Sequence, residues 1–234
     1  GAVDFKIAEA PIDAPTPENW SDIIRHRPGC LIRSTILFEN YLVRLEREAA
    51  LPRIVIRDLT SEEEHSITFD EEAYDLSLHP GYEYTTTSLR FAYSSPTTPQ
   101  RIYDYDMATR ERVLRKEQEI PSGHNPDDYI VERVDCKSHD GRMVPLTITR
   151  HKNTKLDGTA NLLLYGYGSY GSSMSPNFST TRLSLINRDI IWVTAHIRGG
   201  MERGMKWWKE GKLLNKKNTF EDYIASAKYL IENK

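Results

Sequence analysis

The sequence is poor in cysteine, in clustered basic residues and in long apolar runs. Only two of its 234 residues are cysteines, Cys30 and Cys136, and they lie far apart without the spacing of a metal site. Each is therefore interpreted as a small buried apolar residue rather than as half of a disulfide. No segment has the length of a transmembrane helix or the pattern of a signal peptide, so we expect a cytoplasmic location and no membrane partner.

An excess of charge of one sign is also lacking. The 31 basic and 34 acidic residues give a formal net charge of −3, and no group of Lys and Arg is dense enough to form a nucleic-acid surface. The acidic run 62–64 before His65 does not predict a metal site, because adjacent side chains do not converge on one ion. The composition is that of an ordinary globular protein, for which we expect neither nucleic acid nor a metal as a partner.

The most distinctive stretch that is present is NLLLYGYGSYG, residues 161–171. Three glycines stop its apolar run 162–164, which leaves room only for a short strand that ends in a loop. The loop carries Tyr165, Tyr167 and Tyr170, whose hydroxyls can donate hydrogen bonds where glycine lets another backbone approach closely. The pattern predicts a place to hold a ligand.

The first 120 residues are predicted to be all β-structure. Segments 36–46 and 53–59 alternate apolar and polar side chains around a connector with Pro52, and segments 89–95 and 101–107 repeat the arrangement. Corresponding positions in the two strand pairs are 48 residues apart. That period is typical of β-propeller blades, although two copies leave unrelated hairpins in a sandwich as the alternative. A complete propeller needs at least about four blades, and this segment supplies about two and a half.

The second half has a different pattern. The polar run 117–129 contains two prolines and a glycine and is predicted to connect two domains. A β-hairpin with Asp140-Gly141 as its turn follows it. Strand and helix then alternate, which indicates a parallel sheet covered by helices. The predicted strands are 161–165 and 190–197, and the predicted helices lie near 180–188 and from Phe220 onward, where the apolar residues have helical spacing.

Long motifs throughout the chain carry a resemblance to a known family. They are APIDAPTPENW at 10–20, SSPTTP at 94–99, YDYDMATRER at 103–112, PSGHNPDDY at 121–129, LLLYGYGSYG at 162–171, RLSLINR at 182–188, AHIRGG at 195–200 and KKNTFEDYIAS at 216–226. Through them the sequence resembles the prolyl oligopeptidase family of serine peptidases, most closely its oligopeptidase B branch.

The resemblance implies a mixed fold, with a β-propeller that caps an α/β-hydrolase domain. Residues 1–122 would be the C-terminal part of the propeller, and residues 123–234 the first part of the catalytic domain. The family hydrolyses short peptides by acyl transfer with a Ser, Asp and His triad, and its oligopeptidase B branch cleaves after Arg or Lys. No glycine-flanked serine of the kind that carries the nucleophile in this fold occurs here. The chain is therefore expected to be an internal piece that is inactive alone.

The resemblance also assigns roles to two tyrosines. Matching residue by residue, Tyr167 would donate its hydroxyl to the oxyanion of the tetrahedral intermediate, a catalytic role. Tyr170 would wall the pocket for the residue before the scissile bond, a substrate-binding role. In the alternative interpretation, all three tyrosines of the loop are packing residues. His196 and Arg198, in AHIRGG, are interpreted as structural.

Three hypotheses about the function remain. The first is a serine oligopeptidase that cleaves after Arg or Lys, and the others are a prolyl-specific oligopeptidase and a non-catalytic propeller that binds partners. The segment SSMSPNFS, residues 172–179, contains no acidic residue that could recognise a basic side chain, so a preference for Arg or Lys rests on the resemblance alone. Short peptides are the expected partners, and the chemistry needs no cofactor. No oligomeric state is predicted.

Overall fold

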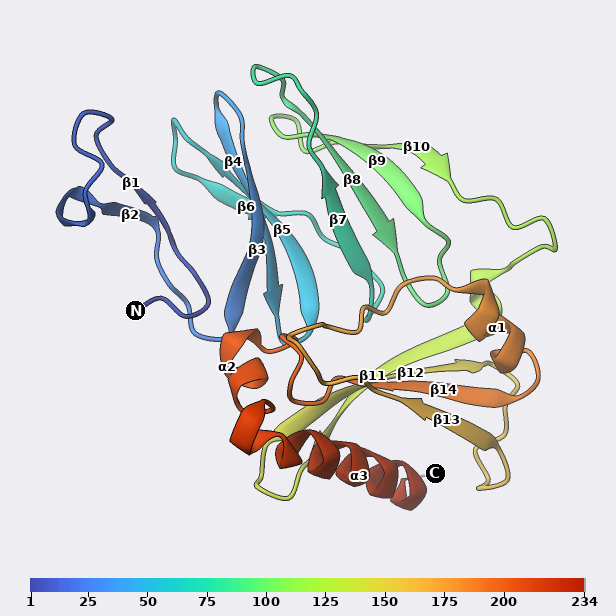
Figure 1. The fold of residues 1–234 in the computed structure, drawn as a ribbon. Coiled ribbons are helices and arrows are strands. Elements are labelled where there is room, and N and C mark those ends of the chain that lie inside the picture. Colours follow the sequence, from blue (N-terminus) through green and yellow to red (C-terminus); the bar gives the residue numbers. More distant parts are fainter. Residues whose placement is uncertain (234) are drawn as a thin grey trace.

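The first half of the chain forms antiparallel sheets. The computed structural model describes residues 1–233. Two of the sheets, each of four strands, stand side by side above a third sheet with its helices (Figure 1). In both upper sheets, strands that follow one another in the chain are neighbours. The strands of the first are β3 (Cys30–Leu37), β4 (Tyr41–Glu48), β5 (Leu51–Asp58) and β6 (Glu64–Ser66), and those of the second are β7 (Asp75–His79), β8 (Ser88–Ser94), β9 (Arg101–Asp106) and β10 (Arg112–Glu117).

The 48-residue period corresponds to these two sheets. Its repeated segments are β4 and β8, the second strand of each sheet, and β5 and β9, the third strand. The two sheets bury one another's faces in a shared apolar cluster that includes Val43, Ile54, Ile56, Leu89 and Phe91, none of which is exposed. The prediction of propeller blades is confirmed. A further antiparallel pair, β1 (Ile7–Glu9) and β2 (Ser21–Ile24), precedes them and is followed by β3.

One strand boundary predicted from the sequence is wrong. Segment 36–46 is not one strand, because the chain turns at residues 38–40 between β3 and β4. Pro52 is not in a connector either, since it lies inside β5 opposite Arg47. The turn before it is formed by Ala49 and Ala50, whose φ angles are 49° and 66°. Alanine rarely adopts this left-handed backbone, so the sequence contained no turn signal there.

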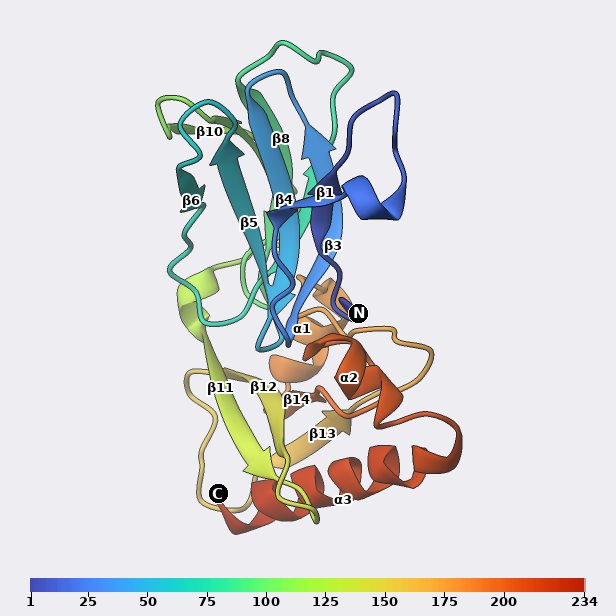
Figure 2. The ribbon, with the colours of Figure 1, turned by 90° about the vertical axis from the view of Figure 1, so that its left-hand side faces the viewer.

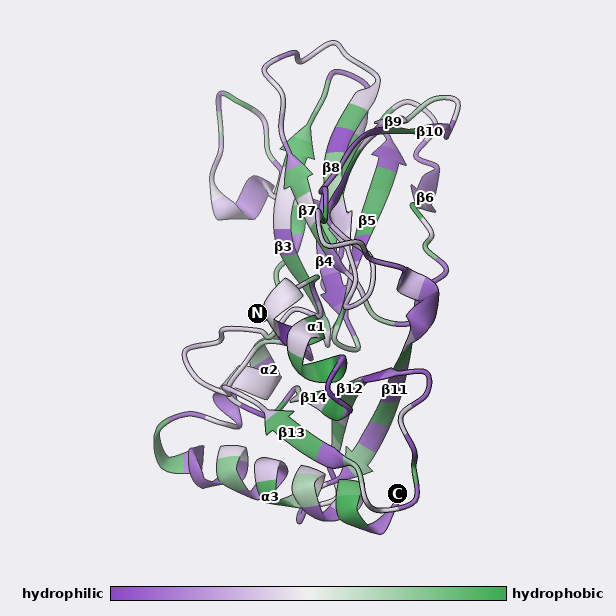
Figure 3. Ribbon diagram, turned by 90° about the vertical axis from the view of Figure 1, so that its right-hand side faces the viewer, coloured by the Kyte–Doolittle hydropathy of each residue, from purple (hydrophilic) through white to green (hydrophobic). Residues whose placement is uncertain are grey.

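The lower sheet is mixed. Its strand order is β11-β12-β14-β13, in which β11, β12 and β14 are antiparallel neighbours and β13 and β14 are parallel. The predicted hairpin is confirmed as β11 and β12, with the turn around Gly141, whereas the predicted parallel arrangement holds for one strand pair only. Figure 3 shows β13 as a largely apolar strand at the edge. The bounds are β11 (Tyr129–Lys137), β12 (Met143–His151), β13 (Asn161–Tyr165) and β14 (Ile190–Ala195).

Helices lie on both sides of this sheet. In Figure 1, α1 (Thr180–Ile186) lies above the sheet and α3 (Lys217–Glu232) below it, while α2 (Gly204–Lys209) contacts β3. Short 3-10 turns occur at Pro17–Asn19, Pro126–Asp128 and Leu213–Asn215. The sequence predicted α1 and α3 but not α2. Within residues 1–233, no helix is long and apolar enough to cross a membrane.

The fully buried residues of α3 are polar. They are Thr219, Asp222 and Ser226, while the apolar Phe220 and Ile224 are 61% and 48% exposed. Helical spacing therefore located the helix, but the apolar residues do not supply its most buried positions. Both cysteines are buried and free, as predicted.

The upper and lower parts are joined by hydrogen bonds between segments far apart in the chain. The side chain of Asp4 is 2% exposed and accepts from the backbone N–H of Met205, in α2, at 2.6 Å and from that of Gly29 at 2.7 Å. The N–H of Ala50, in the turn between β4 and β5, donates to the carbonyl of Glu202 at 2.9 Å. Figure 2 shows the N-terminal residues beside α2, at the junction of the two parts.

Candidate functional site

The glycine-rich loop begins where the parallel strand pair ends. Residues 161–165 of β13 pair with residues 190–194 of β14, and the last matched pair is Tyr165 with Thr194. The loop 166–171 therefore leaves the carboxyl end of the sheet. In open α/β sheets this is the edge at which ligands bind.

The loop packs against the turn 198–200 almost backbone to backbone. The N–H of Gly171 donates to the carbonyl of Gly199 at 2.9 Å. A Cβ on Gly199 would lie 1.9 Å from the carbonyl oxygen of Gly168, and one on Gly168 would lie 2.8 Å from the carbonyl oxygen of Arg198. Both glycines also have positive φ, +104° and +60°, which other residues rarely adopt. Glycine is required at both positions because the two segments approach so closely.

Residues at the start of α3 hold the loop from below. Lys216 donates through Nζ to the carbonyl of Gly168 at 2.5 Å and to Oγ of Ser169 at 2.8 Å, and burial lowers the pKa of Lys216. Thr219 donates through Oγ1 to the carbonyl of Arg198 at 2.8 Å. The sequence analysis did not assign a role to either residue, although both belong to the motif KKNTFEDYIAS. The spacing of the polar residues Thr219, Asp222 and Ser226 could have indicated a polar helix face that is buried.

Arg198 joins three elements beneath the loop. Its side chain is 1% exposed, and its Nε and Nη2 donate to the two carboxylate oxygens of Asp222, in α3, at 2.8 and 2.6 Å. Its Nη1 donates to Asp140, in the turn of the β11–β12 hairpin, at 2.5 Å. Burial opposes the charge of Arg198, but the hydrogen bonds to Asp222 and Asp140 outweigh it and raise its pKa. The predicted structural role of Arg198 fits these contacts.

His196, two residues before Arg198, has Thr147 and Glu202 beside its ring nitrogens. It is 2% exposed, and its Nε2 lies 2.8 Å from Oγ1 of Thr147 on β12. Its Nδ1 has no hydrogen-bond partner within residues 1–233 and lies 3.9 Å from a carboxylate oxygen of Glu202. These contacts agree with the predicted structural role of His196.

The three loop tyrosines have different surroundings. Tyr165 is 43% exposed, and its ring lies 5.9 Å from that of Trp192, so it packs against the sheet. Tyr167 is also 43% exposed, and its hydroxyl makes no hydrogen bond within residues 1–233. Tyr170 has a φ of 54° and an 89% exposed side chain. All three tyrosines are thus exposed, and of the three only Tyr165 has an aromatic neighbour in the part of the chain that the structure describes.

Comparison with known families matches both parts of this architecture. Residues 1–118 match the profile described as "Prolyl oligopeptidase, N-terminal beta-propeller domain", and residues 176–234 match the one described as "Prolyl oligopeptidase family". The chain belongs to the prolyl oligopeptidase family. The resemblance found in the sequence is confirmed, as is the mixed fold of propeller blades and the start of a hydrolase domain.

Individual members of the family are similar over the whole chain. The chain is 40% identical to dipeptidyl aminopeptidase BI of Pseudoxanthomonas mexicana and 30% identical to protease 2 of Moraxella lacunata, over 99% of its own length and 32% and 33% of theirs. The structure of oligopeptidase B from Leishmania major matches it with a TM-score of 0.91 at 33% identity, over 99% of this chain and 34% of that one. The chain therefore spans about a third of the length of these relatives.

A cleft separates the propeller and hydrolase parts of this prolyl oligopeptidase family member. Its volume is about 590 Å³, and Tyr170 lines it together with residues of β3, β4 and the segment around α2. Tyr170, the predicted substrate-binding residue, is therefore on the wall of an open cleft. Tyr165 and Tyr167 do not line it.

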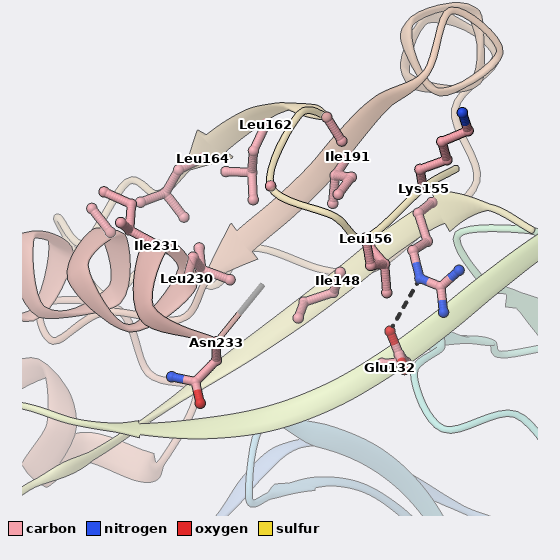
Figure 4. Close-up of a pocket in the computed structure, with 14 residues that line it drawn as sticks. Glu132, Ile148, Lys155, Leu156, Leu162, Leu164, Ile191, Leu230, Ile231 and Asn233 are labelled. Atoms are coloured by element: carbon pink, nitrogen blue, oxygen red, sulfur yellow. Dashed lines mark hydrogen bonds and ion pairs between the residues drawn. The ribbon is translucent and has the colours of Figure 1, made fainter. Parts of the chain in front are cut away.

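A second, more apolar cavity lies away from the tyrosine loop. Figure 4 shows it between the edge strand β13, the end of α3 and the loop that precedes β13, lined by Leu162, Leu164 and Ile191 among others. Its volume is about 470 Å³, and none of the three tyrosines lines it. Its charged lining residues are Lys155 and the ion pair of Arg150 with Glu132, and since it does not adjoin the loop, we assign the chemistry to the loop.

Proposed function

We propose that this chain is part of a serine peptidase that hydrolyses short peptides by acyl transfer, with residues 1–122 as propeller and residues 123–234 as the start of the catalytic domain. The observation that carries the proposal is the loop after β13, which leaves the carboxyl end of the sheet next to the cleft. A hydrolase of this fold takes one oxyanion donor from that position and the other from beside the nucleophile.

Tyr167 is the donor in this proposal. Attack on the peptide carbonyl places negative charge on its oxygen, and a donor that is already in place stabilises this charge without reorganisation. Tyr167 is 43% exposed, and its hydroxyl makes no hydrogen bond within residues 1–233. Lys216 holds the carbonyl of Gly168 on one side of Tyr167, and the pairing of Tyr165 with Thr194 holds the backbone on the other. The loop can therefore hold a phenol in a constant position, which is what this chemistry requires.

The choice of substrate has two candidates. A preference for Arg or Lys before the scissile bond is supported by the similarity to oligopeptidase B. Removal of dipeptides from a free N-terminus is supported by the 40% identity to a protein named dipeptidyl aminopeptidase BI. A proline preference and a non-catalytic binding module are the remaining alternatives. We also propose a cytoplasmic location.

The test uses the complete protein that contains this chain. We expect it to hydrolyse peptides and to be titrated stoichiometrically by a serine-directed covalent inhibitor. Matched peptides with Arg, Lys or Pro before the scissile bond, each with a free or an acetylated N-terminus, separate the candidate specificities. Binding of these peptides without hydrolysis would favour the binding module.

The same assay applied to residues 1–234 alone gives a further prediction. This chain has no serine in the Gly-x-Ser-x-Gly pattern of the nucleophile, and loss of the triad removes most of the acceleration of such an enzyme. We expect no hydrolysis and no labelling by the inhibitor. Stoichiometric labelling of residues 1–234 would contradict this interpretation of the site.

A further inference from the structure

The cleft between the two parts has a charge pattern that the proposed function does not explain. Only two charged side chains line it, Arg33 of β3 and Arg47 of β4. The other polar groups on its walls are the hydroxyls of Tyr170 and of serines 172, 173 and 175. No acidic side chain lines the cleft in the part of the chain that the structure describes. Its walls therefore offer only positive charge and hydroxyl donors.

Arg47 is largely buried and forms no ion pair. The residue as a whole is 6% exposed, no hydrogen bond or ion pair within residues 1–233 engages its guanidinium, and the guanidinium nitrogens are not fully enclosed. Burial and the nearby charge of Arg33 lower the pKa of Arg47 to about 10, while Glu202 and Asp75 act on it from a distance without forming an ion pair. Arg47 is thus charged at neutral pH. Taking a charge largely out of water without an ion pair is costly, and the guanidinium of Arg47 lines the cleft with its donors unused within residues 1–233.

Arg33 is directed to the same place by an irregularity of its strand. The register of β3 on β4 shifts between Ile32 and Ser34, so Arg33 is the extra residue of a β-bulge. Bulges re-aim side chains and are frequent next to active sites. Arg33 also makes no hydrogen bond or ion pair within residues 1–233. Across the cleft, the hydroxyl oxygen of Ser173 is buried and has no hydrogen-bond partner within the same residues.

We infer that Arg33 and Arg47 form a carboxylate-binding subsite of the cleft, which takes an acidic group of the bound peptide. A carboxylate accepts two parallel hydrogen bonds from one guanidinium and still has lone pairs for a second donor. Tyr170 lines the same cleft, and its exposed hydroxyl can donate to a remaining lone pair. This inference rests on the proposed peptidase function and specifies one feature of its substrates.

The acidic group can come from two sources, an acidic side chain or the free C-terminus of the peptide. The experiment uses the complete protein and two peptide pairs of one cleavable sequence, Glu against Gln at each position after the scissile bond, and a free C-terminal acid against its amide. We expect the acidic member of one pair to have a kcat/KM higher by about tenfold to a hundredfold, the range for a hydrogen bond to a charged group. The pair that shows this ratio identifies the source.

Arg33→Gln and Arg47→Gln should each reduce that ratio toward one and leave kcat/KM for the neutral peptide within about twofold. Arg47→Lys keeps the charge but cannot donate two parallel hydrogen bonds to one carboxylate. Its ratio of kcat/KM for the acidic and neutral peptides should lie between those of the unmodified protein and Arg47→Gln. Arg25→Gln is the matched control, because Arg25 is exposed on the same part of the chain and does not line the cleft. If Arg47→Gln does not fold, the exposed Arg33→Gln still provides the test.

Two results overturn the inference: ratios near one for both pairs in the unmodified protein, or a ratio that Arg33→Gln and Arg47→Lys leave unchanged. If no peptide is cleaved at all, the proposed function fails instead. In that case the subsite is tested by binding: the acidic member of one pair should have the lower dissociation constant, and Arg33→Gln should remove the difference.

Discussion

Among single residues, Tyr167 can be tested most directly. Replacing it by phenylalanine in the complete protein keeps the ring and removes only the donor. Because a hydrogen bond to the oxyanion strengthens as charge develops, its loss should raise the barrier more than it weakens binding of the substrate. We expect kcat to fall by roughly a hundredfold to a thousandfold with a small change in KM.

Tyr165→Phe is the matched control, because the ring of Tyr165 packs on Trp192 and does not need its hydroxyl to do so. Its kcat should change by less than about threefold, and that of Tyr170→Phe should change far less than that of Tyr167→Phe. Steady-state kinetics of the three variants on one peptide is the measurement. Equal, small losses in all three would return Tyr167 to a packing role.

A second test at this scale concerns a buried carboxylate. Glu46, on β4, is 1% exposed and accepts hydrogen bonds from Arg44 at 2.9 Å, Arg53 at 2.9 Å and Arg27 at 2.7 Å. Glu46→Gln removes the charge that these guanidinium groups surround. We expect the free energy of unfolding to fall by on the order of 3 kcal/mol, measured by urea denaturation. Glu48→Gln, at an exposed pair with Arg53, should cost less than about 1 kcal/mol.

The effect of Glu46 should depend on pH with a defined sign. Burial opposes its ionisation, but the hydrogen bonds from Arg44 and Arg53 outweigh it and hold its pKa below the usual range. A carboxyl whose pKa is lower in the folded state stabilises the fold above its unfolded value, about 4.3. This contribution disappears as the pH falls through the lower, folded value. The stability difference between the unmodified protein and Glu46→Gln should therefore shrink below about pH 4 and stay constant above pH 6.

The sequence predicted apolar and polar alternation in β4, but not that both faces are buried. Residues 41–47 are all buried, including Arg44 and Glu46. The partners that make this possible, Arg27 and Glu64, lie 19 residues before Glu46 and 20 residues after Arg44 in the sequence. Pairings over such separations are decided by the tertiary fold and not by local pattern.

At the scale of elements, the glycine loop gives a prediction about backbone packing. A Cβ on Gly168 would lie 2.5 Å from Cγ2 of Thr219 and 2.8 Å from the carbonyl oxygen of Arg198. Gly168→Ala must therefore displace the loop in addition to straining a backbone with a φ of +60°. We expect the complete protein to lose at least about 2 kcal/mol of stability and at least tenfold in kcat, as the displaced loop carries Tyr167.

Gly123→Ala is the matched control that measures the cost of the left-handed backbone without a steric clash. Its φ is +80°, and a Cβ there would meet nothing within 4 Å, so only the cost of the left-handed conformation remains, about 1 to 2 kcal/mol. Urea denaturation of both variants is the measurement. Equal losses of stability, with kcat unchanged in Gly168→Ala, would mean that the loop is not tightly held.

The elements that sequence reasoning missed share a cause. Helix α2 begins at Gly204 after a residue that provides no side-chain cap, so no start signal precedes it. The turn at Ala49 and Ala50 has no glycine or asparagine for its left-handed backbone. At both places tertiary contacts override local preference, since Ala50 is bound by Glu202 and the N–H of Met205 by Asp4.

For the whole molecule, exposed edges and faces predict association of residues 1–234 alone. β13 is an edge strand whose Leu162 is 40% exposed, and β10 exposes Val113 and Leu114 by 47% and 46%. Unpaired strand edges and bare blade faces invite pairing with other chains. We expect oligomers by light scattering and binding of a hydrophobic dye.

Charged substitutions should identify which surface is responsible. Leu162→Lys places a charge at the β13 edge, and Val113→Lys places one on the β10 face; either should reduce association if its surface drives it. A monomer that unfolds cooperatively and binds no dye would show that these surfaces are not apolar enough to associate.

The overall architecture could be predicted well because it is encoded in spacing. The 48-residue period, the Asp140-Gly141 hairpin and the strand before the glycine loop are all local or repeated patterns. The support of the loop could not be predicted, because Arg198 gathers Asp140 and Asp222 from positions 58 and 24 residues away. Periodicity identifies elements, whereas a polar cluster drawn from three elements appears only when they are folded together.

The hydrogen bond between Asp4 and Met205 has a consequence for how the protein is made. The two residues are 201 positions apart, and a ribosome adds about 5 to 20 residues per second. At this rate the synthesis of Met205 follows that of Asp4 by on the order of ten seconds or more. The two propeller blades can close before then, because their contacts are local, and Asp4 can already accept from Gly29, whereas its contact with α2 forms only after Met205 has been made. The contact that joins Asp4 to α2 is thus completed long after Asp4 itself has been synthesised.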